Sequence, residues 1–203
     1  YRKEFIDQYQ LRFYSEREIM LEDFDFNIRA YLYAKGIAIC DSAEYHHLLV
    51  KGSLSKAYRP DRILMEDKLM KRTEKFLLQE EHFLTSKQER MNHFRNFVRK
   101  SCVNVIYNCS CLSKENSYQK IKDNIELILE QQKYKTAFAK KYHDKDHFYY
   151  RFFYYLISNK QIVLLTYSMI LSHTLNYVYR LYVKVKAEIM RRNGDRDGRE
   201  YKC

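Results

Sequence analysis

The sequence predicts an all-α fold, an irregular or orthogonal bundle of about six to eight helices. Gly occurs four times and Pro once in 203 residues, whereas a β-rich fold needs many turns, and turns depend on these two residues. Lys, Leu, Glu and Arg, which favour helices, are abundant. A chain of this length can bury a core without disulfides or metals. We therefore expect long helices with few connections.

Helix starts are marked by capping boxes, in which a capping residue is followed three positions later by Glu or Gln. The pattern occurs at Ser15, Asp41 and Ser158. Each predicts a helix that begins directly after it. A short helix over 4–13 should precede a helix over about 16–35, and the last should be a long helix over 159–192.

A second long helix is predicted near 61–107. Apolar residues recur there every seven positions. The neighbouring heptad line is mostly polar, so the pattern indicates a one-sided stripe against a helical core rather than a coiled-coil seam. The repeating residues are Ile63, Met70, Leu77, Leu84, Met91 and Val98.

Residues 108–117 form the clearest predicted loop, rich in Asn, Ser and Cys. We expect it to separate an N-terminal helical subdomain, 1–107, from an aromatic-rich helical subdomain, 118–192. One continuous domain is the alternative. The last residues, 193–203, combine Gly with charges of both signs, so they are predicted to be a disordered tail.

The net charge of +11 is unevenly distributed along the chain. Residues 1–60 carry nine Lys or Arg and nine Asp or Glu, whereas residues 61–203 carry 28 and 17. An excess of this size favours acidic partners. Nucleic acid is the partner that we expect, with anionic lipid and acidic protein as alternatives.

Three basic stretches interleave cations with aromatic residues, within 90–100, 133–145 and 180–192. Cations neutralise phosphates, and aromatic rings stack on unpaired bases. The alternative is an ordinary amphipathic helix with its rings in the core and its cations in water. No sequence signature of a known nucleic-acid-binding motif accompanies the stretches. The candidate binding residues are Arg90, Arg95, Arg99, Lys100, Lys133, Lys135, Lys140, Lys141, Arg180, Lys184, Arg191 and Arg192.

A dense aromatic block spans 148–155. Seven rings on one helix cannot all face one core, so some should cover a partner or a second subdomain. A helix buried on all sides is the alternative. The candidate interface residues are Phe148, Tyr149, Tyr150, Phe152, Phe153, Tyr154 and Tyr155. Together with the charge, the block favours a non-enzymatic interaction subunit of a larger assembly.

Five cysteines form no disulfide framework. We therefore expect an intracellular, reducing compartment such as the cytoplasm, the nucleus or an organelle matrix. The chain opens at Tyr1 rather than Met, so we expect it to belong to a longer protein.

No metal, cofactor or catalytic motif is predicted. Cys102, Cys109 and Cys111 lack the spacing of a zinc site. An enzyme whose site is assembled from scattered residues is a minor alternative. Its first candidates would be Glu44, His46, His47, His143 and His147.

A membrane-associated protein is the main alternative. Residues 161–179 form an uncharged run that is long enough to span a bilayer. The cations that follow it suit a membrane-anchored segment. In this alternative, 161–183 would be inserted. Seven polar groups within the run instead favour a helix of a soluble bundle.

Overall fold

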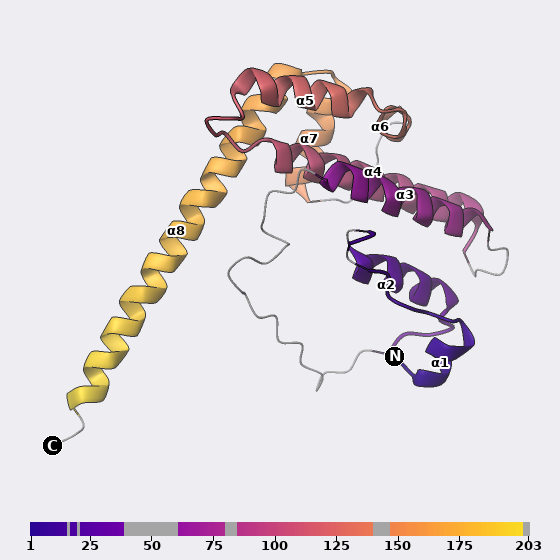
Figure 1. Cartoon of the computed structure of the whole chain (residues 1–203), viewed down its shortest axis with the longest axis horizontal. Coiled ribbons are helices and arrows are strands. Elements are labelled where there is room, and N and C mark those ends of the chain that lie inside the picture. Colours follow the sequence, from indigo (N-terminus) through magenta and orange to yellow (C-terminus); the bar gives the residue numbers. More distant parts are fainter. Residues whose placement is uncertain (16, 20, 39–60, 80–84, 140–146, 201–203) are drawn as a thin grey trace. The chain divides into compact units, whose positions relative to one another are not determined.

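The computed structural model describes residues 1–15, 17–19, 21–38, 61–79, 85–139 and 147–200, and within them it contains eight α-helices and no strand (Figure 1). The all-α prediction is confirmed. The chain divides into two compact units, residues 1–105 and 106–203. This division falls inside a helix and close to the boundary expected at 107. The assignment of separate subdomains stays a prediction.

Unit 1 is built on aromatic and aliphatic contacts between its helices. Its helices are α1 (Lys3–Gln8), α2 (Glu22–Tyr33), α3 (Arg62–Gln79) and most of α4 (Lys87–Cys109). Phe24 of α2 stacks on Phe97 of α4 with ring centroids 4.5 Å apart. Tyr33 of α2 meets Phe76 of α3 edge to face at 5.8 Å. Contacts of this kind bury large apolar areas in fixed geometries, so they help to hold the three longer helices together.

A buried ionic cluster joins α2 to α3. Asp25 accepts hydrogen bonds from Arg29 Nη2 at 2.7 Å and from Arg72 Nε at 3.0 Å. Arg29 also donates to the Arg12 carbonyl. The Arg72 guanidinium lies 3.5 Å from the ring centroid of Tyr14. The buried carboxylate is therefore surrounded by cations, as a buried charge must be.

The long helix predicted over 61–107 consists instead of α3 and α4. The Ser86 hydroxyl accepts from the Glu89 amide, and Glu89 accepts from the Ser86 amide at 3.0 Å. This capping box starts a new helix. The hydrogen bond from the Ser86 amide to the Glu89 carboxylate lowers the pKa of Glu89 most, and a second bond from the Ser86 hydroxyl lowers it further. Arg90 also donates back to the Leu77 carbonyl.

The helix predicted from residue 16 begins later, at Glu22. Ser15 does accept a hydrogen bond, but from the Arg17 amide at 3.2 Å, within a turn. Leu21 then adopts a left-handed backbone with φ of 62° and becomes the N-cap of α2. A bulky residue in that conformation interrupts a helix. The helix predicted after Asp41 lies outside the described residues.

The described residues of unit 2 form four helices besides the end of α4. They are α5 (Tyr118–Glu130), α6 (Gln132–Phe138), α7 (Phe148–Ser158) and α8 (Ile162–Glu200). Ser117 caps α5 by accepting from the Lys120 amide. The buried residues Ile121, Ile125 and Ile128 recur at helical spacing along α5, which packs against α6 and α8. This stripe forms much of the core of unit 2.

The last helix starts at Ile162 rather than after a cap at Ser158. Ser158 ends α7, and Lys160 adopts a left-handed φ of 54°. The Gln161 amide donates to the Leu156 carbonyl at 2.9 Å, which is the bond of a Schellman motif. At its other end, α8 continues to Glu200. The disordered tail expected over 193–203 stays a prediction.

Candidate protein interface

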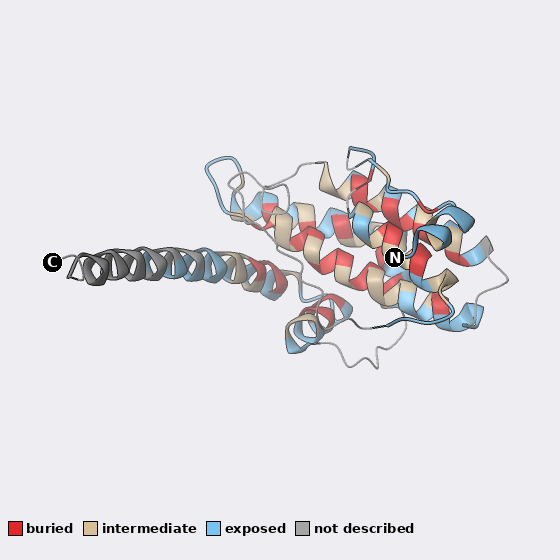
Figure 2. Ribbon diagram, turned by 90° about the horizontal axis from the view of Figure 1, so that it is seen from below, coloured by how far each residue is buried: buried red, intermediate tan, exposed pale blue. Residues whose placement is uncertain are grey.

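One face of α8 packs against the other helices of unit 2. Leu165, Thr166 and Met169 are fully buried, and α8 packs on α5 and α7. Thr166 satisfies its hydroxyl by donating to the Ile162 carbonyl at 2.8 Å. Among the described side chains of α8, the buried ones in Figure 2 lie in its first turns. The start of the helix therefore belongs to the core of unit 2.

Polar aromatic contacts fix the next turns of α8. His173 stacks on Tyr107 with ring centroids 4.9 Å apart. Asn176 donates to the Tyr107 hydroxyl at 3.0 Å. Burial raises the pKa of Tyr149 on α7 above its ordinary value, and the hydrogen bond of Tyr149 with Ser172 of α8 partly opposes this rise. These contacts orient the helix up to about residue 176.

The opposite face of α8 carries an exposed apolar stripe, which we call the α8 seam. From Leu171 to Val185 its residues alternate at spacings of four and three. Ser168 occupies the position in this pattern between Leu164 and Leu171. At about 100° per residue, they share the side opposite to Met169. Each is between 49% and 60% exposed. The seam consists of Leu164, Leu171, Leu175, Val178, Tyr182 and Val185.

Apart from the hydrogen bond of Asn176 to Tyr107, the described side chains in the middle of α8 are exposed on all sides of the helix. Every residue from Thr174 to Tyr179 is exposed, as are Tyr182, Val183 and Val185. In Figure 1, α8 runs on past α5 and α7. Contiguous apolar surface of this kind marks an interaction site more often than a free surface.

The aromatic block predicted as an interface is divided between two faces of α7. Phe153 and Tyr154 are buried, while Tyr149 and Tyr150 are half-buried. Phe148, Phe152 and Tyr155 are exposed. The exposed three follow spacings of four and three, so they form one stripe on the side of α7 away from the core. Only this stripe remains available to a partner.

The basic stretch at 90–100 does not form a single exposed face. Arg90 and Arg99 are buried, at 7% and 3% exposure. Arg90 donates to the Leu77 carbonyl, and Arg99 donates to Asn96 Oδ1 at 3.3 Å. These two arginines therefore serve the interior of unit 1, and we remove them from the candidate nucleic-acid residues.

The other candidate cations are accessible or fall outside the description. Arg95 and Lys100 are half-buried on α4. Lys133 lies 4.9 Å from the ring centroid of Tyr134, and Lys135 forms an ion pair with Glu130. Lys140 and Lys141 lie outside the described residues, as do the side chains of Arg180, Lys184, Arg191 and Arg192.

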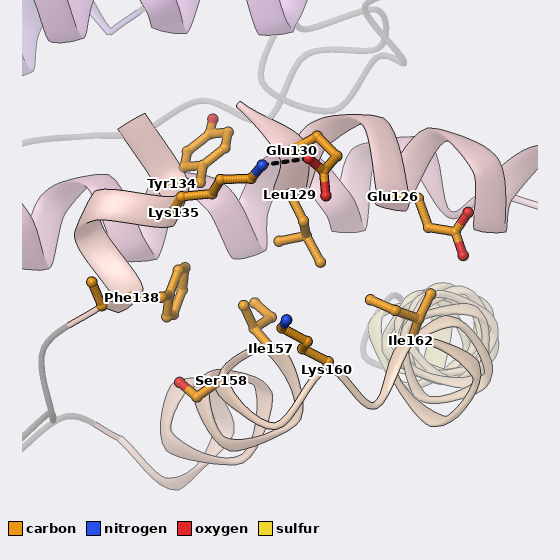
Figure 3. A pocket seen from close by; sticks show the side chains of 11 residues that line it. Glu126, Leu129, Glu130, Tyr134, Lys135, Phe138, Ile157, Ser158, Lys160 and Ile162 are labelled. Carbon is orange, nitrogen blue, oxygen red and sulfur yellow. Dashed lines mark hydrogen bonds and ion pairs between the residues drawn. The ribbon is translucent and has the colours of Figure 1, made fainter. Parts of the chain in front are cut away.

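A pocket of about 550 Å³ lies in unit 2, between the C-terminal end of α5, α6, and the turn from α7 to α8 (Figure 3). Leu129, Phe138 and Ile157 give it apolar walls. Its rim includes Glu130, whose pKa is lowered by the hydrogen bond and the charge of Lys135, and to a lesser extent by Lys160. The rim charges compensate one another, so the pocket has no strong preference for an anion or a cation.

The candidate enzyme residues are not brought together by the described part of the chain. Glu44, His46, His47 and His143 lie outside it, and His147 is the N-cap of α7, where Nδ1 accepts from the Tyr149 amide at 3.3 Å. Within the described residues, no three His, Cys, Asp or Glu side chains are grouped closely enough to bind a metal ion.

None of the described helices has both the length and the apolar character needed to cross a bilayer. This includes α8, where the membrane alternative places its inserted segment, 161–183.

The chain matches no protein-family model, no curated protein and no solved structure.

The α8 seam was not among the sites predicted from the sequence, although its signal is present there. Leu164, Leu171, Val178 and Val185 repeat every seven residues, and Leu175 and Tyr182 form the second line. The uncharged, largely apolar run of residues 161–179 instead predicts a buried helix. Periodicity shows that a helix has an apolar face, but not whether that face meets the same chain or a partner.

Proposed function

We propose that this chain is a non-enzymatic interaction subunit of a larger assembly and that it binds a protein partner through the α8 seam. The observation that carries the proposal is the exposure of six apolar seam residues on one side of α8. Burial of apolar area contributes about 25 cal/mol per Å², so docking of a complementary helix would be favourable. The exposed stripe of α7, Phe148, Phe152 and Tyr155, supplies a second aromatic surface.

Photo-cross-linking in cells tests the protein-binding function. Replacement of Tyr182 by p-benzoylphenylalanine places the probe in the seam without a large change in size. We expect a discrete cross-linked protein product from this position, because the seam would be in van der Waals contact with its partner. The measurement is the mass of the product on a denaturing gel and by mass spectrometry.

Tyr177 is the matched control for this experiment. It lies on the same helix with the same 60% exposure as Tyr182, but it faces another side. The probe at position 177 should give little or no product. Equal labelling from both positions, or none from Tyr182, would contradict the proposed function.

We also propose that the basic excess of residues 61–203 binds an acidic partner, with nucleic acid as the expected one. The support is the count of 28 Lys or Arg against 17 Asp or Glu. Binding to generic RNA or DNA should then weaken steeply with salt, because each neutralised phosphate releases counterions.

Replacement of Arg95 by Ala should reduce the slope of log affinity against log salt by about 1. Replacement of Lys35, an exposed residue in the neutral first 60 positions, should leave the slope unchanged. Fluorescence anisotropy with a labelled oligonucleotide measures both. Salt-independent or absent binding would remove the nucleic-acid part of the proposal and leave the protein-binding part standing.

A further inference from the structure

We infer that the occupant of the α8 seam is a second copy of this chain, whose α8 lies antiparallel to the first. The inference rests on the proposed function of the seam as a docking surface. It adds the identity of the partner and the direction in which its helix runs.

The spacing of the seam suits helix pairing by knobs into holes. Alternating steps of three and four place apolar side chains on one line of a supercoiled helix. Val185 lies 21 positions after Leu164, so the seam is about 32 Å long at 1.5 Å per residue. That length corresponds to three heptads, and Ser168 is its one polar position.

The flanks of the seam favour a partner that is itself uncharged. Coiled coils between two different chains commonly carry Glu and Lys beside the apolar seam, and these charges select the partner. Residues 161–179 contain no Lys, Arg, Asp or Glu, so charges on a partner would lose water there without gaining a counter-ion. A second copy presents the hydroxyl groups of its own Thr174 and Tyr179 to the same surface.

The charge that follows the seam decides the direction. Residues 180–192 contain five Lys or Arg and one Glu. Parallel pairing would bring the two cationic segments together, and their repulsion would oppose association. Antiparallel pairing places each cationic segment beside the uncharged 161–179 of the other copy.

The body of unit 2 leaves room for this partner. The core contacts of α8 come from Leu165, Thr166 and Met169, which lie on the side opposite to the seam. A two-fold axis through the seam would therefore pair two α8 helices while α5 and α7 stay on the outer sides of the pair. Such an interface is self-complementary, as two-fold dimers require.

Analytical ultracentrifugation of the full chain tests the inference. We expect a monomer–dimer equilibrium that tightens as salt rises, because both copies carry +11 and salt screens their repulsion. Tyr182→Glu should weaken dimerisation at least about tenfold, a change equal to roughly 1.4 kcal/mol. Tyr177→Glu, at equal exposure on another face, should leave it unchanged within about twofold, roughly 0.4 kcal/mol. Circular dichroism confirms that both variants keep their helicity.

Energy transfer between donor and acceptor dyes at the C-termini of two copies tests the direction. Low transfer within a dimer supports the antiparallel arrangement, and high transfer overturns it. A chain that stays monomeric at every concentration, or a dimer unaffected by Tyr182→Glu, overturns the second copy as occupant. In that case a cross-link from position 182 to a different protein keeps the proposed function, whereas the absence of any cross-link removes both.

Discussion

Replacement of Asp25 by Ala is expected to lower the free energy of unfolding by about 3–5 kcal/mol. Asp25 is 3% exposed and accepts hydrogen bonds from Arg29 and Arg72. Without the carboxylate, the buried Arg29 guanidinium loses its counter-ion and retains its hydrogen bond to the Arg12 carbonyl. A buried charge that loses its counter-ion is far more costly than the pair is stabilising. Domains commonly have only 5–15 kcal/mol of stability in total, so this loss is severe.

Urea denaturation followed by circular dichroism measures this change. Asp23→Ala is the control, because Asp23 lies in the same first turn of α2 but is exposed. Its loss removes a favourable interaction with the helix dipole, about 0.3–1 kcal/mol, and the hydrogen bond that its exposed carboxylate accepts from the Phe24 amide at 2.8 Å. Similar midpoints for the two variants would mean that the cluster of Asp25, Arg29 and Arg72 does not stabilise the fold.

The fold class was predictable because it depends on composition. A chain with one Pro and four Gly cannot make the many turns of a β fold. Helix boundaries depend on local contacts that compete with one another. Ser86 and Glu89 have the capping-box spacing and do start α4, but the apolar heptad line across them predicted continuity. There the local cap prevailed over the periodicity.

Two other helix caps were predicted at positions where the structure has no helix start. Ser15 and Ser158 both have the spacing of a capping box. Leu21 and Lys160 instead adopt left-handed backbones and set the adjacent helix ends. Neither residue favours that conformation by itself, so the packing of the flanking helices must impose it. Sequence patterns alone do not contain that information.

The candidate sites were predicted least well, for a related reason. Arg90 and Arg99 appear on a basic stretch of the sequence, but each is buried. Conversely, Leu175 and Val178 belong to an uncharged run that suggests burial, but both are exposed. Residue type gives the average location of a side chain. Its actual location depends on which helix faces are covered, and only the tertiary structure determines that.

Replacement of Ile125 by Ala is expected to lower the free energy of unfolding of unit 2 by about 2–5 kcal/mol. Ile125 is fully buried at the centre of the α5 stripe, between Ile121 and Ile128. The loss combines the transfer free energy of the removed methyl groups with the cavity that they leave. Since α5 packs on α8, this core also fixes the base from which the seam projects.

Leu127→Ala provides the matched control, because Leu127 is an aliphatic residue of the same helix with 68% exposure. Its replacement should change stability by less than about 0.5 kcal/mol. Hydrogen exchange of α5 and α8 amides, read by mass spectrometry, separates local loss from global unfolding. If Ile125→Ala left protection of the first turns of α8 unchanged, α5 would not be what holds that helix, and the seam would have to be positioned by α7 and by the contacts of Tyr107 with His173 and Asn176.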